Sequence, residues 1–93
     1  MAIDINLERQ IIRLVQIGQT RKMITELGIF FAPGDWARIA ERLAIYILET
    51  STNLSEQYKK IIAKTITAIR KENVSPSLIE ELGDIVQEVY QNN

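Results

Sequence analysis

The chain has 93 residues, a formal net charge of −1, 46% hydrophobic and 25% charged residues, and neither cysteine nor histidine. This length and composition predict one globular domain spanning residues 1–93, and a net charge near zero argues against a protein that is basic throughout. Without cysteine and histidine the chain lacks disulfides, the commonest metal ligands and the usual general base near neutral pH. This composition argues against most enzyme classes, and no cofactor is expected.

The first residues of the chain contain no basic stretch followed by an apolar core, as a secretory signal would. No segment approaches the roughly 18 uninterrupted apolar residues of a membrane-spanning helix. We therefore expect a soluble, cytoplasmic protein with no membrane partner.

Apolar residues at helical spacing predict a first helix over residues 7–31, with Asp4 or Asn6 as a candidate N-cap. Before Gly18 its apolar stripe comprises Leu7, Ile11, Leu14 and Val15. After Gly18 the apolar residues, Met23 among them, fall on the opposite side of the helical wheel. Either Gly18 ends one helix and Thr20 caps another, or one helix buries different faces along its length. We favour a continuous or kinked helix, because a single glycine costs only about 1 kcal/mol.

The segment after this helix carries two adjacent phenylalanines, Phe30 and Phe31, ahead of Ala32-Pro33-Gly34, which stops a helix and starts a turn. Both rings cannot point into one core from one helix face. The segment is either a plug over one end of the bundle or an exposed apolar site for a partner.

A second helix is predicted over residues 34–50, opened by Pro33 or Asp35. Its buried stripe comprises Trp36, Ile39, Ala40, Leu43 and Ile47. Ile45 instead lies among charged residues on the other face. The candidate partner-binding residues are therefore Met23, Phe30, Phe31 and Ile45.

A third helix is predicted over residues 54–72, where Asn53 and Glu56 match a capping box. After a short turn, Ser75 caps a fourth helix over residues 76–91. No alternation of apolar and polar residues persists long enough to indicate a strand.

The four predicted helices alternate in net charge: the first and third are positive, and the second and fourth are negative. In an antiparallel bundle this alternation places opposite charges on neighbouring helices, which requires no ligand. The alternative is that the third helix presents a phosphate-binding stripe to nucleic acid. The candidate nucleic-acid-binding residues are Lys59, Lys60, Lys64, Arg70 and Lys71. Such a role suits a small helical subunit of a nucleoprotein complex, by analogy of architecture with the small subunits of CRISPR surveillance complexes.

The run Glu80-Glu81-Leu82-Gly83-Asp84 places Glu81 and Asp84 one helical turn apart, where paired carboxylates can hold Mg²⁺. It resembles the second half of the metal motif of MazG-type nucleotide pyrophosphatases, which pairs an ExxE turn with an ExxD turn on a later helix. The resemblance covers these five residues and implies Mg²⁺-dependent nucleotide hydrolysis, but the upstream ExxE turn is absent. The alternative is an acidic, solvated helix face on which Gly83 allows close packing.

The sequence therefore predicts an all-α fold, specifically an antiparallel four-helix bundle. Our leading functional hypothesis is a non-enzymatic interaction module that acts as a subunit or adaptor of a larger assembly or as a homo-oligomer. The nucleic-acid role of the third helix is the second hypothesis, and nucleotide pyrophosphatase activity is the third. Under the leading hypothesis, Phe31→Asp leaves the bundle folded and abolishes association.

Overall fold

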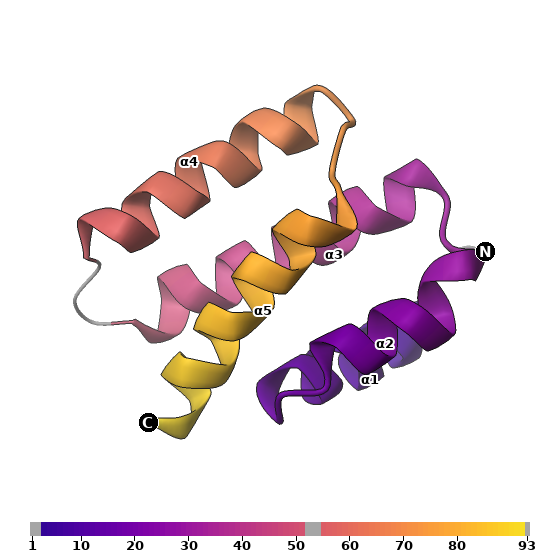
Figure 1. The fold of residues 1–93 in the computed structure, drawn as a ribbon, viewed down its shortest axis with the longest axis horizontal. Coiled ribbons are helices and arrows are strands. Elements are labelled where there is room, and N and C mark those ends of the chain that lie inside the picture. Colours follow the sequence, from indigo (N-terminus) through magenta and orange to yellow (C-terminus); the bar gives the residue numbers. More distant parts are fainter. Residues whose placement is uncertain (1–2, 52–54, 93) are drawn as a thin grey trace.

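The computed structural model describes residues 3–51 and 55–92, which form helices and no strand. The elements are α1 (Ile5–Gln16), α2 (Thr20–Leu27), the short 3-10 helix η1 (Gly28–Phe30), α3 (Pro33–Thr50), α4 (Glu56–Arg70) and α5 (Pro76–Gln91). Successive α-helices run in opposite directions (Figure 1). The predicted all-α fold is confirmed, but five α-helices replace the four that were expected.

The chain reverses at Gly18, so the prediction of one helix over residues 7–31 is wrong. Gly18 has a φ of 82°, which glycine adopts without the steric penalty that a Cβ imposes. Its N–H donates to the Val15 carbonyl at 3.1 Å, and the Gln19 N–H donates to the Leu14 carbonyl at 2.8 Å. These two bonds form a Schellman motif that ends α1. The apolar stripe changes sides at Gly18 because the chain turns back there.

Local capping explains where α1 and α5 begin. The Asp4 carboxylate accepts a hydrogen bond from the Leu7 N–H at 2.8 Å, and the Ser75 hydroxyl accepts one from the Leu78 N–H at 3.2 Å. Each bond satisfies a backbone donor that the first helical turn leaves unpaired. Ser75 is the predicted cap, and Asp4 is one of the two predicted candidates.

Two other helices begin at residues that were not predicted. The hydroxyl of Ser55 caps α4 by accepting from the Tyr58 N–H at 3.2 Å, whereas Asn53 lies outside the described residues. Gln19 occupies the N-cap position of α2, so Thr20 is the first residue of that helix and not its cap.

The helices form three layers, with α4 on one side, α3 and α5 in the middle, and the α1–α2 hairpin on the other side (Figure 1). Most of the largest fully buried side chains belong to α3 and α5, namely Ile39, Leu43, Ile47, Ile79, Leu82 and Val86. α5 contacts all four other α-helices. In a simple up-and-down bundle, a helix packs mainly on the helices next to it in the sequence. α5 packs on α4 and also on α1, α2 and α3.

The α2–α5 contact depends on a glycine. A Cβ at Gly83 would lie 2.5 Å from the Thr20 Oγ1 atom, and Thr20 is itself buried. The absence of a side chain at Gly83 thus lets the first turn of α2 approach the backbone of α5, as the close-packing interpretation predicts.

Within residues 3–51 and 55–92, no helix combines the length and the apolar character that crossing a bilayer requires.

Candidate interaction surfaces

The segment that joins α2 to α3 presents two large apolar side chains to solvent. Ile29 is 81% exposed and Phe30 is 56% exposed, both on η1. We call these two residues the η1 apolar patch. The next residue, Phe31, points inward and packs edge-to-face on Trp36, with ring centroids 5.1 Å apart. The two adjacent phenylalanines therefore differ: Phe30 is exposed, and Phe31 packs against the core.

Because Phe31 packs against the core, a substitution at this position does not test association alone. An edge-to-face aromatic pair contributes about 0.5–1.5 kcal/mol beyond the burial of its area. Because Phe31→Asp removes this pair and leaves a carboxylate against the core, it disturbs folding as well as any surface role. Substitutions at Ile29 and Phe30 separate the two effects.

Met23 and Ile45 do not extend the patch. Met23 is 1% exposed and belongs to the core, so its prediction as a surface contact is corrected: α2 packs on α5, and its apolar face is used there. Ile45 is half-buried on α3, beside Arg42 and Glu41 in a shallow hollow. It lies among charged side chains, as predicted.

The five basic residues of the proposed phosphate-binding stripe are all exposed, on α4 or immediately after it. Two of them already have acidic neighbours: Lys59 Nζ lies 3.3 Å from Glu56, and Lys64 Nζ lies 3.4 Å from Glu81 of α5. Within the described part of the chain, no ion pair involves the remaining three, Lys60, Arg70 and Lys71.

A groove separates α4 from α5, and its two walls carry opposite charges. Lys60 and Lys64 line the α4 side, and Asp84 and Glu88 line the α5 side. Near one end, burial raises the pKa of the Tyr58 hydroxyl, and a hydrogen bond to Glu88 and the charge of that carboxylate raise it further. The acidic wall repels phosphate, so the groove itself is a poor nucleic-acid site.

Ion pairs occupy both carboxylates of the ExxD turn. Glu81 pairs with Lys64 at 3.4 Å, and Asp84 lies 3.5 Å from Arg21 of α2, which also reaches Glu80 at 3.9 Å. In the part of the chain that the structure describes, no group of three or more potential ligand side chains is placed to hold a metal ion. These contacts agree with the interpretation of the alternating charges as complementary helix surfaces.

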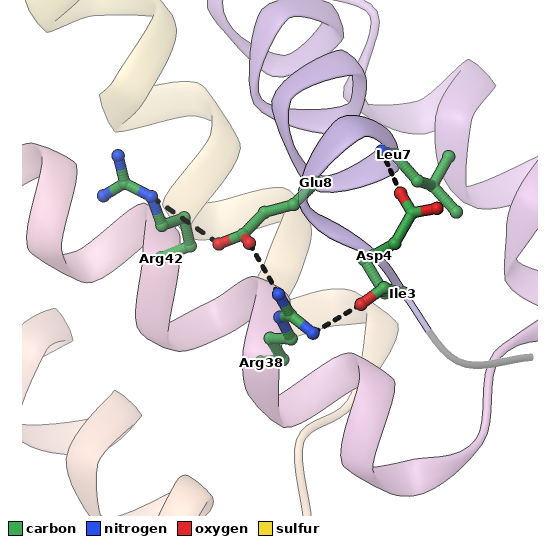
Figure 2. A network of polar contacts seen from close by, with 6 residues as sticks. All are labelled: Ile3, Asp4, Leu7, Glu8, Arg38 and Arg42. Atoms are coloured by element: carbon green, nitrogen blue, oxygen red, sulfur yellow. Dashed lines mark hydrogen bonds and ion pairs between the residues drawn. The ribbon is translucent and has the colours of Figure 1, made fainter.

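The sequence reasoning missed a polar network that joins α1 to α3 (Figure 2). The Glu8 carboxylate on α1 lies 2.9 Å from Arg38 Nη2 and 3.6 Å from Arg42 Nε, both on α3. Arg38 also donates to the carbonyl of Ile3. The Glu8 side chain is only 16% exposed, so the two arginines hold a largely buried charge at the contact between the helices.

Two further arginines, Arg9 and Arg13, lie on the adjacent face of α1. With Glu8 and Arg42 they line a hollow between α1 and α3 that includes the exposed side chain of Ile5. Arg38 lines a second hollow, which shares Glu8 and Arg42 with the first. We call the four arginines of the two hollows, Arg9, Arg13, Arg38 and Arg42, the arginine groove. Each helix supplies its two arginines four residues apart, a spacing visible in the sequence. The sequence does not show that the two pairs meet.

Tyr90 of α5 contacts one residue of the arginine groove, Arg13. Its hydroxyl accepts a hydrogen bond from Arg13 Nη1 at 2.7 Å, and the Arg13 guanidinium carbon lies 5.7 Å from the centroid of the ring. The ring remains more than a third exposed. The groove thus combines guanidinium groups with an aromatic face.

Comparisons of the chain with protein-family models, with characterised proteins and with solved structures each found no match.

Proposed function

We propose that this protein is a non-enzymatic helical interaction module that acts as a subunit or adaptor of a larger assembly or as a homo-oligomer. The observation that carries the proposal is the η1 apolar patch, in which Ile29 and Phe30 expose adjacent apolar side chains. Adjacent large apolar side chains on a surface are typical of contact sites between proteins.

The setting of the patch favours a binding role. η1 is held between α2 and α3, and the Phe31–Trp36 ring pair anchors the following residue to the core. A patch on an anchored segment loses little conformational freedom when a partner covers it. Burying an isoleucine or phenylalanine side chain contributes about 1.5–3 kcal/mol, so these two side chains supply a large part of a moderate affinity.

The proposal is tested by replacing the patch and measuring association. We expect the wild-type protein to associate in sedimentation velocity experiments or to retain a partner from extracts of its native cell. Ile29→Ser with Phe30→Ser is expected to abolish that association while the helical circular dichroism is unchanged. The matched control is Leu48→Ser with Ile66→Ser, which removes two other exposed apolar side chains, on α3 and α4.

The control distinguishes a specific patch from general surface hydrophobicity. If both double variants lose association equally, the η1 apolar patch is not the contact. A wild-type protein that remains monomeric at every concentration and retains no partner would contradict the interaction module as a whole.

A second candidate function is an accessory role in nucleic-acid binding through α4. It is supported by the exposure of Lys60, Arg70 and Lys71, for which no acidic partner is found among the described residues. Lys60→Glu with Lys71→Glu is expected to weaken binding to nucleic acid at low salt. Unchanged binding would exclude this role for α4. Lys64 is left intact in this test because its loss would leave Glu81 unpaired.

We do not extend the proposal to nucleotide hydrolysis. Glu81 and Asp84 each lie within 3.5 Å of a basic side chain, which competes with a metal ion for the carboxylate oxygens.

A further inference from the structure

We propose that the arginine groove between α1 and α3 is a binding site for single-stranded nucleic acid. The proposal is independent of the η1 apolar patch, since none of its residues belongs to that patch. It also places nucleic-acid binding on a different face from the basic stripe of α4. Three features support it: the charge of the groove, the availability of its guanidinium groups and the aromatic ring of Tyr90 beside Arg13.

The hollows along the α1–α3 contact contain more basic than acidic side chains. Their four arginines face two carboxylates, Glu8 and Glu41. Among the residues that the structure describes, neither Arg9 nor Arg13 forms an ion pair, and Arg13 donates a hydrogen bond to the Tyr90 hydroxyl. The groove therefore has a positive excess that its own side chains leave uncompensated.

Glu8 orients its arginines and leaves most of their donors available. A guanidinium group has five N–H donors in a planar fork. Arg42 approaches Glu8 through Nε, and its terminal nitrogens point away from the carboxylate (Figure 2). The side chains of Arg38 and Arg42 are 47% and 40% exposed. Pre-oriented forks of this kind match the geometry of phosphate oxygens.

The spacing of the arginines suits an extended ligand more than a single anion. The residues of each pair are separated by one helical turn, a rise of about 6 Å. One pair is on α1 and the other on α3, so the positive charges follow the groove. A chain of phosphates can contact several of these groups at once.

The Tyr90 ring favours nucleic acid over an acidic peptide. Proteins that bind single strands combine a positively charged groove with aromatic side chains on which bases stack. Tyr90 lies next to Arg13, and the apolar side chain of Ile5 is exposed in the hollow that Arg13 lines. An acidic peptide would use the arginines and leave these apolar surfaces without a matching group. Double-stranded nucleic acid keeps its bases stacked inside the helix, where the ring cannot reach them.

The experiment removes two positive charges either from the groove or from the exposed face of α4 and compares the effects on binding. A fluorescently labelled oligothymidylate of about 20 nucleotides is titrated with protein, and binding is followed by anisotropy between about 50 and 200 mM salt. Arg9→Gln with Arg13→Gln removes two charges from the groove. Lys60→Gln with Lys71→Gln removes two charges from the exposed stripe of α4 and is the matched control. Circular dichroism checks that both variants fold.

We expect the groove variant to bind the strand at least about tenfold more weakly, and its salt slope to fall by about 1.4, the contribution of two phosphate contacts on a single strand. The α4 variant is expected to weaken binding less than the groove variant does, because it leaves the groove intact. Tyr90→Leu, which retains an apolar side chain and removes the aromatic face, is expected to weaken binding by about tenfold.

Four results would overturn the proposal. The first is that the wild type does not bind the strand at the lowest salt, and the second is that the groove variant and the α4 control weaken binding equally. The third is that Tyr90→Leu binds as the wild type does. The fourth is that polyglutamate or duplex DNA, at the same concentration of charge, displaces the strand. The last result would assign the groove to anions in general. Loss of association in the η1 variant does not bear on any of the four.

Discussion

Glu72, at the end of α4, adopts a backbone conformation that suits glycine better. Its φ is 51°, and its N–H donates to the Ile69 carbonyl at 3.0 Å while the Asn73 N–H donates to the Ala68 carbonyl at 2.9 Å. This is the same Schellman motif that Gly18 completes after α1. The left-handed conformation costs a residue with a Cβ about 1–2 kcal/mol, and a carboxylate is unfavourable at the negative end of the helix dipole.

We therefore expect Glu72→Gly to stabilise the protein by about 0.5–1 kcal/mol, after the greater flexibility of glycine in the unfolded chain is deducted. Urea denaturation measures the change. Glu72→Ala is the control, because it removes the same charge and keeps the strained backbone. Equal stabilisation by both substitutions would mean that charge is the cause and that the conformation contributes nothing.

At the scale of the element, the packing of α2 on α5 depends on the match between Gly83 and Thr20. An added Cβ at position 83 would lie 2.5 Å from Oγ1 and 2.8 Å from Cγ2 of Thr20. Overpacking of a core typically costs about 1–3 kcal/mol, and the higher helix propensity of alanine recovers about 1 kcal/mol. Gly83→Ala is thus expected to destabilise the protein by up to about 2 kcal/mol.

A double-mutant cycle identifies the contact responsible. Thr20→Ala removes both of the closest atoms, so the pair Gly83→Ala with Thr20→Ala is expected to lose less stability than the sum of the two single changes. Thermal denaturation of the four proteins measures this coupling. Additive effects would show that α2 does not approach α5 at this glycine.

The sequence predicts features that depend on residues close together in the chain, and it does not predict those that depend on contacts between distant helices. Asp4 and Ser75 cap helices through bonds to residues three positions away, and both were among the predicted caps. The turn at Gly18 was not, although glycine and a shifted apolar stripe were both visible, because the contact of α2 with α5 outweighs the continuity of one helix. The arginine groove was also missed, since it exists only where the faces of α1 and α3 meet.

Across the whole molecule, the helices of the three layers differ in how many of their side chains are buried. α3 and α5 supply most of the buried side chains, whereas the buried residues of α4 are Ile62 and Thr65. Its contact with α5 borders a groove with charged walls, and one ion pair there, Lys64 with Glu81, is exposed. Exposed pairs contribute about 0–1 kcal/mol, so they do not compensate for the smaller apolar contact.

We expect α4 to open before the rest of the fold, because local stability follows the amount of buried apolar contact. In native-state hydrogen exchange, the amides of α4 should exchange faster than those of α3 and α5, with a free energy of opening below that of global unfolding. Ile62→Ala should lower protection in α4 more than in α5, whereas Ile79→Ala, in the central layer, should lower it everywhere. If the amides of α4 and α5 are equally protected, the three layers unfold as one cooperative unit and α4 does not open separately.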